Sequence, residues 1–164
     1  MDILKLSSEW AKAEVFSSKI VWIFSVIEII AAFGFLYLGK TSMAKAFFWP
    51  LLIMGLFLVA VGAGLYFTNN PRVEQFEKQY QSDPDAFVQS EIQRTTKSKG
   101  EMVNVLRILP AIILIAAIVL LLVSSPLWRA IAVTIAINAA FLMIVDSNTE
   151  ARNNFYNTQL ISNK

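Results

Sequence analysis

Four apolar runs dominate this 164-residue sequence, and each run is long enough to cross a lipid bilayer. They lie at about residues 20–39, 47–67, 106–124 and 126–145. A helix of about 20 apolar residues spans a hydrocarbon core of about 30 Å. Backbone groups in lipid must be paired within the segment, and these runs lack the strict alternation of barrel strands. The sequence therefore predicts an all-α, polytopic membrane protein with a bundle of four transmembrane helices.

Composition agrees with a membrane protein, because 56% of the residues are hydrophobic and only 16% are charged. A soluble domain of this length could not bury so much apolar surface. The chain contains neither Cys nor His. Disulfides and thiolate metal sites are thereby excluded, and metal or acid–base chemistry loses its commonest side chain. We therefore expect no metal site and no cofactor.

A cleaved signal peptide is the alternative interpretation of the first apolar run. The stretch Ala44-Lys45-Ala46 has the A-x-A form of a cleavage site. However, residues 1–19 precede the run, and the run is longer than the roughly 7 to 15 apolar residues of a signal core. These lengths favour a retained first span.

The Lys and Arg residues lie mostly on one side of the four spans. With four crossings, the N-terminus, the loop between the second and third spans, and the C-terminus share a side. Of the fourteen basic residues, all but Lys40, Lys45 and Arg129 fall there, the last of them being Lys164. Because cytoplasmic loops carry the excess of Lys and Arg, we expect cytoplasmic termini and a bacterial inner (cytoplasmic) membrane as the location.

These boundaries divide the chain into five segments. They are an N-terminal cytoplasmic amphipathic segment (1–19), a first transmembrane hairpin (20–67), a cytoplasmic helical loop (68–105), a second transmembrane hairpin (106–145) and a cytoplasmic tail (146–164). The turn at Ser124-Ser125-Pro126 is short, so the third and fourth spans should be antiparallel neighbours.

The loop between the second and third spans carries two helix starts, Asn70-Pro71 and Asp83-Pro84. In each pair the first residue is expected to cap the helix and the proline to occupy its first position. The apolar faces expected of the two helices are Val73, Phe76 and Tyr80, and Phe87, Val88 and Ile92. The loop should therefore fold as a helical hairpin.

The two terminal segments are expected to pack beside this hairpin. The N-terminal segment combines Trp10, Ala13 and Phe16 with charged residues, which suits a short helix lying at the membrane interface. The tail should extend the fourth helix and place Ala151, Phe155 and Leu160 on or near one face. Together these parts would form a cytoplasmic cap over the bundle.

Glu28 lies near the middle of the first span, where a charge costs about 2.5–3.5 kcal/mol. Asn138 of the fourth span should lie at a similar depth, because each residue is some 11–13 Å from the same end of its span at 1.5 Å per residue. The first hypothesis is a buried, protonated carboxyl that bonds Asn138 across the bundle. The alternatives are a proton or cation site and a contact with a membrane-embedded partner.

Small residues mark faces where helices approach closely, either within one bundle or against another protein or second copy. In the second span Ala60 and Gly64 form a small-xxx-small pair, and the fourth span has an alanine stripe at i+4 spacing. The full set predicted for helix packing or a partner interface is Gly55, Ala60, Gly62, Gly64, Ala132, Ala136 and Ala140.

Basic residues gather just before and at the start of the third span. We expect them to contact anionic membrane lipids, and the residues are Arg94, Lys97, Lys99 and Arg107. Arg107 and Asp146 lie at compatible heights and could pair. The net charge of +2 and the lack of a continuous basic stripe argue against a nucleic-acid partner.

The sequence contains no catalytic signature. It has no GxSxG, HExxH or Gly-rich phosphate loop, so we expect neither an enzyme nor any catalytic residue. The outer loops are short, and a partner must be met inside the bilayer or from the cytoplasm. We expect a non-catalytic protein that acts by protein–protein association with another membrane protein, a toxin or itself. An immunity protein against a membrane-active toxin and an accessory subunit of a membrane complex both suit this architecture.

One feature resembles the small multidrug resistance transporters, namely four spans with a single membrane-embedded glutamate in the first, here Glu28. The long N-terminal segment and the loop hairpin depart from that compact pattern. The resemblance implies the alternative function, a small proton- or cation-coupled transporter or channel that works as a homo-oligomer through Glu28.

Overall fold

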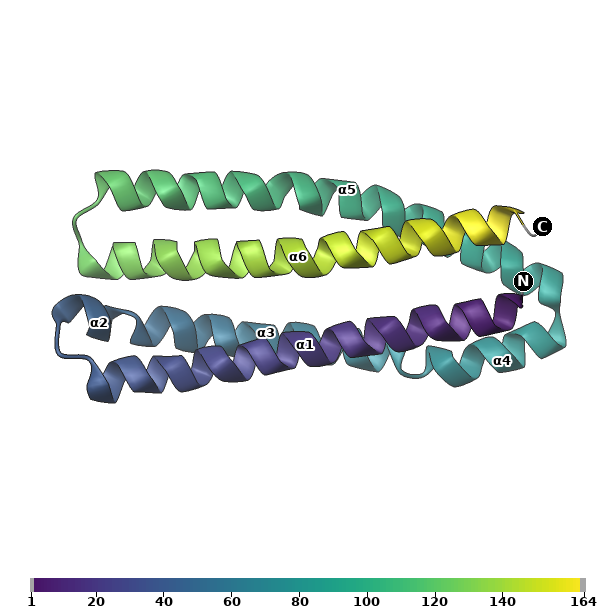
Figure 1. Cartoon of the computed structure of the whole chain (residues 1–164), viewed down its shortest axis with the longest axis horizontal. Coiled ribbons are helices and arrows are strands. Elements are labelled where there is room, and N and C mark those ends of the chain that lie inside the picture. The colour runs from purple at the N-terminus through teal and green to yellow at the C-terminus, as the bar shows by residue number, and fades with distance from the viewer. Residues whose placement is uncertain (1, 163–164) are drawn as a thin grey trace.

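The computed structural model of this chain describes residues 2–162, which form six helices and no strand. The helices are α1 (Ile3–Leu38), α2 (Ser42–Ala46), α3 (Phe48–Asn69), α4 (Arg72–Ser82), α5 (Pro84–Leu122) and α6 (Pro126–Ser162). The long helices run along the long axis of the molecule, and both ends of the chain lie at the same end of the bundle (Figure 1). The predicted all-α four-helix architecture is confirmed, whereas the basic residue Lys164 lies outside the described residues.

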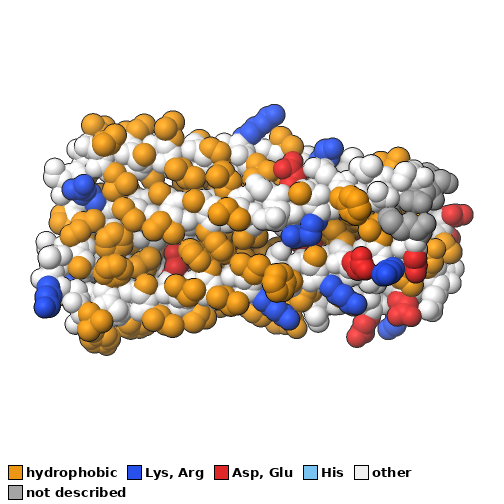
Figure 2. All heavy atoms as spheres, viewed as in Figure 1, with side chains coloured by type: hydrophobic (Ala, Val, Ile, Leu, Met, Phe, Trp, Pro, Cys, Tyr) orange, Lys and Arg blue, Asp and Glu red, His pale blue; other side chains and the backbone are white. Residues whose placement is uncertain are grey.

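Four helical stretches are long and apolar enough to cross a membrane, as expected of a multi-pass membrane protein. Figure 2 shows apolar side chains covering the part of the molecule that carries the α1–α3 and α5–α6 connections. Acidic and basic side chains gather toward the end that holds the termini. This division matches a membrane-embedded body with a polar cap at one end.

The long helices are arranged as two hairpins. In one hairpin α1 packs along α3, and in the other α5 packs along α6, while contacts between the hairpins are few and mostly involve α6. Within the described chain, no Cα atom of α5 comes within 8 Å of a Cα atom of α1 or α3. The short α5–α6 turn therefore makes antiparallel neighbours, as predicted, whereas α5 does not pack its backbone closely against the first hairpin and its apolar span is the least buried of the four.

Helix α1 buries a stripe of mostly small or polar residues and turns its large apolar residues outward. The buried positions follow helical spacing and are Ser7, Trp10, Ala11, Glu14, Ser17, Ser18, Val21, Ser25, Glu28 and Ala32. Small side chains permit close approach of helices where lipid, not water, surrounds the bundle. A Cβ atom added at Gly55 of α3 would lie 2.7 Å from the Ile29 side chain of α1, and one added at Gly62 would lie 2.6 Å from the Trp22 ring. These two glycines therefore hold α3 close to α1.

The cap contains the only buried cluster of large apolar residues identified in the described chain. We call it the cap core, and it comprises Trp10, Ala11, Phe76, Phe87, Val88, Tyr156 and Leu160. Trp10 stacks on Tyr156 at a centroid distance of 5.6 Å, and Phe76 meets Phe87 edge-on at 5.4 Å. The predicted packing of both terminal segments against the loop hairpin is thus confirmed.

Two local predictions in this region are wrong. The N-terminal segment is not a separate helix at the interface, because α1 continues without a break from Ile3 to Leu38. Three buried serines of α1, Ser7, Ser18 and Ser25, are compatible with the helix because each donates a hydrogen bond to a backbone carbonyl oxygen three or four residues earlier. Asn70 does not cap α4 either, since it ends α3 in a helical conformation and its N–H donates to Tyr66.

The Asp83 prediction is correct, since its carboxylate accepts a hydrogen bond of 3.0 Å from the Ala86 N–H. The helix that it starts does not end at residue 105, however, but continues through Pro110 into the third span. In the tail, Leu160 is buried as expected, whereas Phe155 is 58% exposed and Ala151 is also exposed. Polar contacts, described below, decide which face of α6 turns inward.

Candidate functional site

Glu28 and Asn138 lie side by side inside the bundle. Asn138 Nδ2 donates a hydrogen bond of 2.6 Å to Glu28 Oε1 and a second one of 2.9 Å to the Thr134 carbonyl oxygen one turn earlier. Only 4% of Glu28 and 1% of Asn138 are exposed. The pairing expected from the similar depths of the two residues is therefore present, and it connects α1 of one hairpin to α6 of the other.

Three atoms around this pair are buried and have no hydrogen-bond partner in the described chain. They are Glu28 Oε2, Asn138 Oδ1 and Thr134 Oγ1. A carboxylate offers only acceptors, as does the amide oxygen of Asn138, so an ionised Glu28 supplies no donor. A proton on Oε2 makes the carboxyl a donor to this group. We therefore expect the neutral acid as the resting form, in line with the cost of a charge at this depth.

The predicted small-residue positions fall into two groups. Gly55 and Gly62 are buried against α1, and Ala132 is buried in α6, with Ala136 and Ala140 partly buried beside it. By contrast, Ala60 and Gly64 are exposed, and a Cβ atom added at Gly64 would meet nothing within 4 Å. The first group packs the chain against itself, whereas the Ala60–Gly64 pair faces outward.

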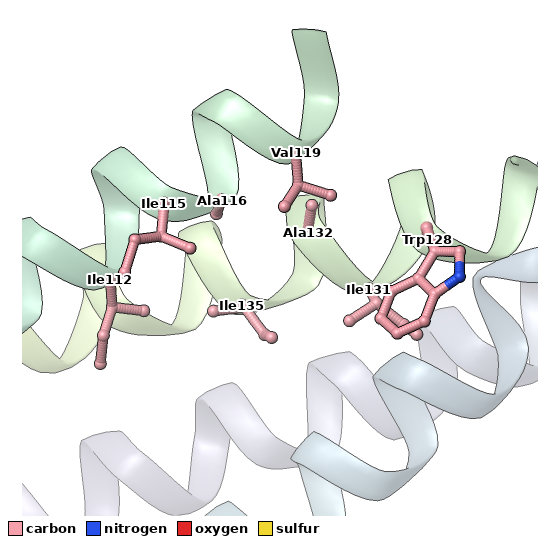
Figure 3. Close-up of a pocket in the computed structure, with 8 residues that line it drawn as sticks. All are labelled: Ile112, Ile115, Ala116, Val119, Trp128, Ile131, Ala132 and Ile135. Carbon is pink, nitrogen blue, oxygen red and sulfur yellow. The ribbon is translucent and has the colours of Figure 1, made fainter. Parts of the chain in front are cut away.

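An apolar groove runs between α5 and α6 in the half of the bundle away from the termini (Figure 3). It has a volume of about 210 Å³. Its walls are entirely apolar or aromatic and consist of Ile112, Ile115, Ala116, Val119, Trp128, Ile131, Ala132 and Ile135. Apart from the Trp128 indole nitrogen, the side chains that line the groove carry no polar atom, which suits an apolar side chain or an acyl chain as its occupant.

The cap contains a buried ion pair that the sequence did not reveal. The Arg152 guanidinium donates from Nη2 and Nε to Glu14 Oε1, at 2.9 and 3.2 Å, and Nη2 also donates to Ser17 Oγ at 2.8 Å. The Glu14 side chain is only 6% exposed. This pair connects α6 to α1 at the membrane side of the cap.

A second polar cluster surrounds Tyr156. The Tyr156 hydroxyl lies 2.7 Å from Ser7 Oγ and donates to Glu91 Oε2 at 3.0 Å. Glu91 also accepts two hydrogen bonds from Arg94, at 2.7 and 2.8 Å. Burial and the neighbouring Glu91 carboxylate raise the pKa of Tyr156 well above its usual range, so the phenol stays neutral. Because α1, α5 and α6 meet here, the cluster fixes the two hairpins relative to each other.

The four predicted lipid-contact residues do not behave as one group. Arg94 is half-buried and paired with Glu91, and Lys97 lies 3.9 Å from Glu101 on an exposed face. Lys99 and Arg107 are exposed. Among the described residues, no ion pair joins Arg107 to Asp146, so that suggested contact is absent.

The candidate site residues of the described chain include no cluster of metal ligands. In the part of the chain that the structure describes, no three carboxylate, Cys or His side chains lie close enough to hold a metal ion. Comparisons with protein-family models, with curated proteins and with solved structures each gave no match.

Proposed function

We propose that this chain is a non-catalytic integral membrane protein that acts by associating with another membrane protein within the bilayer and at the cap. The observation that carries the proposal is the position of α5. This helix crosses the membrane beside α6 alone, without backbone approach to α1 or α3 in the described chain. The apolar span of α5 is the least buried of the four, so it offers a free face to a further transmembrane helix, which would pack by shape rather than by hydrophobicity.

Two further features support a partner helix. The Ala60–Gly64 pair faces outward with open space around Gly64, and such small-residue pairs allow helix backbones to approach closely. The connections on the side away from the termini are short, since α2 has five residues and only residues 123–125 separate α5 from α6. A docking domain on that side is therefore absent from the described chain, and the contact surface lies in the membrane or on the cap.

The excess of Lys and Arg on the terminal side supports a cytoplasmic position for the cap and a bacterial inner membrane for the bundle. In that setting, two roles suit a small membrane protein without a reaction centre. One is immunity against a membrane-active toxin, in which the chain would bind the toxin in the bilayer and block its action. The other is an accessory subunit of a membrane complex. Both roles rest on analogy of architecture.

Site-specific photo-crosslinking in the native membrane tests the association. A photoreactive residue replaces Ile115, which lines the open groove and is 61% exposed, and in a control it replaces Ile27 of α1, which is 56% exposed. We expect a discrete protein adduct from position 115 and only lipid adducts from position 27. An adduct of twice the chain mass would identify self-association. Lipid adducts alone at both positions would contradict the proposal.

A second candidate function is proton- or cation-coupled transport through Glu28. The unpartnered buried atoms Glu28 Oε2 and Thr134 Oγ1 favour it, because a deep carboxyl with free coordination positions can exchange a proton or cation. Proton flux into liposomes separates the two functions. Transport predicts a flux that Glu28→Gln abolishes, whereas the association proposal predicts no flux above that of protein-free liposomes.

A further inference from the structure

A second pocket lies where the cap meets the membrane-embedded body. Its volume is about 470 Å³, and all four long helices and α4 contribute to its wall. Leu65 near the end of α3 and Met102 of α5 form an apolar side, while Trp10, Arg72 and Arg94 form a polar side. The pocket therefore lies between the two hairpins, and α3 and α5 border it without close backbone approach to each other.

The pocket wall carries one cation that lacks a charged partner. Arg94 pairs with Glu91, Lys97 with Glu101, and Glu14 with Arg152. Arg72 forms no ion pair in the described chain, and it donates only to the Asn69 amide oxygen, at 2.6 Å. Burial and the nearby Arg94 charge lower the pKa of Arg72 below its usual value. The Glu91 and Glu14 carboxylates act on Arg72 in the opposite direction, but only from a distance, so an anion in the pocket would supply the direct ion pair that Arg72 lacks in the described chain.

Two residues of the wall also carry buried polar atoms that lack partners. Trp10 is 7% exposed and Asn153 is 3% exposed, yet Trp10 Nε1 and Asn153 Oδ1 have no hydrogen-bond partner in the described chain. The indole offers a donor and the amide oxygen an acceptor, so a matching ligand carries both an acceptor and a donor. Each buried group without a partner is costly, which makes a polar occupant favourable.

Two guanidinium groups lie close to the Trp10 ring. The Arg94 guanidinium lies 4.0 Å from the ring centroid and that of Arg72 lies at 5.8 Å. Stacking on an aromatic face holds a guanidinium without engaging all of its N–H groups. Phosphate oxygens are preferred acceptors for such planar donors.

We propose that this pocket binds the headgroup of one anionic phospholipid, with the phosphodiester beside Arg72, Arg94 and the Trp10 indole. A glycerol hydroxyl of the headgroup supplies the donor for Asn153, and the acyl chains leave past Leu65 and Met102 between α3 and α5. Basic pockets between transmembrane helices bind anionic headgroups in this manner. The proposal concerns a lipid ligand and stands apart from the protein partner proposed above.

This site differs from the lipid contact expected from the sequence. Lys99 and Arg107 do not line the pocket, and Arg72 and Trp10 replace them as the main binding groups. If basic residues were attracted only by the general negative charge of the leaflet, each of these cations would contribute about equally to lipid binding. The pocket instead predicts that one lipid is bound and that Arg72 matters far more than Lys99.

Native mass spectrometry of the full chain in a mild detergent tests the proposal. The probes are dioleoylphosphatidylglycerol, dioleoylphosphatidylcholine and inorganic phosphate. We expect a one-to-one phosphatidylglycerol adduct that forms about tenfold more tightly than the phosphatidylcholine adduct. Arg72→Gln should weaken phosphatidylglycerol binding roughly tenfold, because a charge-assisted hydrogen bond is lost. The matched control Lys99→Gln removes the same charge from an exposed position of α5 and should change binding less than about twofold.

Trp10→Phe is a second variant, since it keeps an aromatic ring in the cap core and removes only the indole donor. It should weaken phosphatidylglycerol binding several-fold. If Arg72→Gln does not fold, Trp10→Phe tests the same site. Equal binding of the two phospholipids, or equal losses in Arg72→Gln and Lys99→Gln, would overturn the proposal. Displacement of the lipid by millimolar inorganic phosphate would overturn it too, and would instead identify a free-anion site.

Discussion

Asn138 of α6 donates a hydrogen bond of 2.6 Å to Glu28 of α1, and this bond joins the two hairpins inside the apolar body of the molecule. Both side chains are almost fully buried. Because the hairpins touch at few other places in the membrane-embedded part, this pair contributes to how they are aligned.

Loss of the amide in Asn138→Leu should lower the free energy of unfolding by about 1 kcal/mol, the usual contribution of an interhelical polar bond in a membrane. Glu28→Gln should have a smaller effect, since its amide oxygen still accepts from Asn138. Unfolding in mixed micelles measures both values. A larger loss in Glu28→Gln than in Asn138→Leu would contradict a mainly structural role and favour a charged or ion-binding carboxylate.

Tyr156 should make stability depend on alkaline pH. An unfolded-state tyrosine has a pKa of about 10, whereas burial and the Glu91 carboxylate raise the pKa of Tyr156 in the folded chain. Below pH 10 both states hold the proton, and the hydroxyl contributes its full stability. Above about pH 10 only the unfolded chain releases it, so stability falls as pH rises. Unfolding measured from about pH 9 to 11 should show a steeper fall in the wild type than in Tyr156→Phe.

The control for this pH profile is Tyr37→Phe, because Tyr37 is 77% exposed at the far end of α1. Its profile should follow that of the wild type. Parallel profiles for the wild type and Tyr156→Phe would show that the hydroxyl is not held in its buried contacts with Ser7 and Glu91.

The Glu14–Arg152 pair should be a strong contributor to the cap. Arg152→Gln leaves the Glu14 carboxylate buried without its charged partner, and we expect a loss of about 1.5–3 kcal/mol of unfolding free energy. Lys97→Gln breaks the exposed Lys97–Glu101 pair and should change the free energy by less than about 1 kcal/mol. Similar losses in the two variants would mean that the Glu14 side chain is solvated.

Gly62 and Gly64 are two residues apart on α3 but face different surroundings. A Cβ atom at Gly62 would lie 2.6 Å from the Trp22 ring, so Gly62→Ala should destabilise the chain by about 1–3 kcal/mol. Gly64→Ala meets open space and should be neutral or stabilising by up to about 1 kcal/mol, because alanine favours a helix. Unfolding of the purified variants checks both values, and a reversed order would place α3 in a different rotation.

Much of the fold could be predicted because lipid imposes simple rules. The length of the apolar runs predicts the membrane-crossing part of each long helix, and the similar depths of Glu28 and Asn138 predict that these two residues meet. Asp83 was predictable as a cap because the proline after it marks the start of a helix. Asn70-Pro71 has the same form, but Asn70 ends the preceding helix and does not cap the next one. The residue spacing alone does not separate these two cases.

The cap network could not be predicted because its partners are far apart in the sequence. Arg152 pairs with Glu14, and Tyr156 reaches both Ser7 and Glu91. The apolar residue Phe155 suggested a different inward face for α6, but the polar contacts of Arg152 and Tyr156 decide it. The four-residue spacing of Arg152 and Tyr156 predicts that both side chains lie on one face of α6. It does not predict which residues that face contacts.

Native mass spectrometry of the chain purified from its host membrane tests the association proposal most directly. It compares the wild type with Gly64→Leu, which fills the outward small-residue face, and with the control Gly100→Leu, which meets equally open space on the terminal side of α5. Association through this face predicts a stoichiometric second polypeptide or second copy in the wild type and in Gly100→Leu, but not in Gly64→Leu. A monomer without a protein partner in all three samples would contradict the proposal.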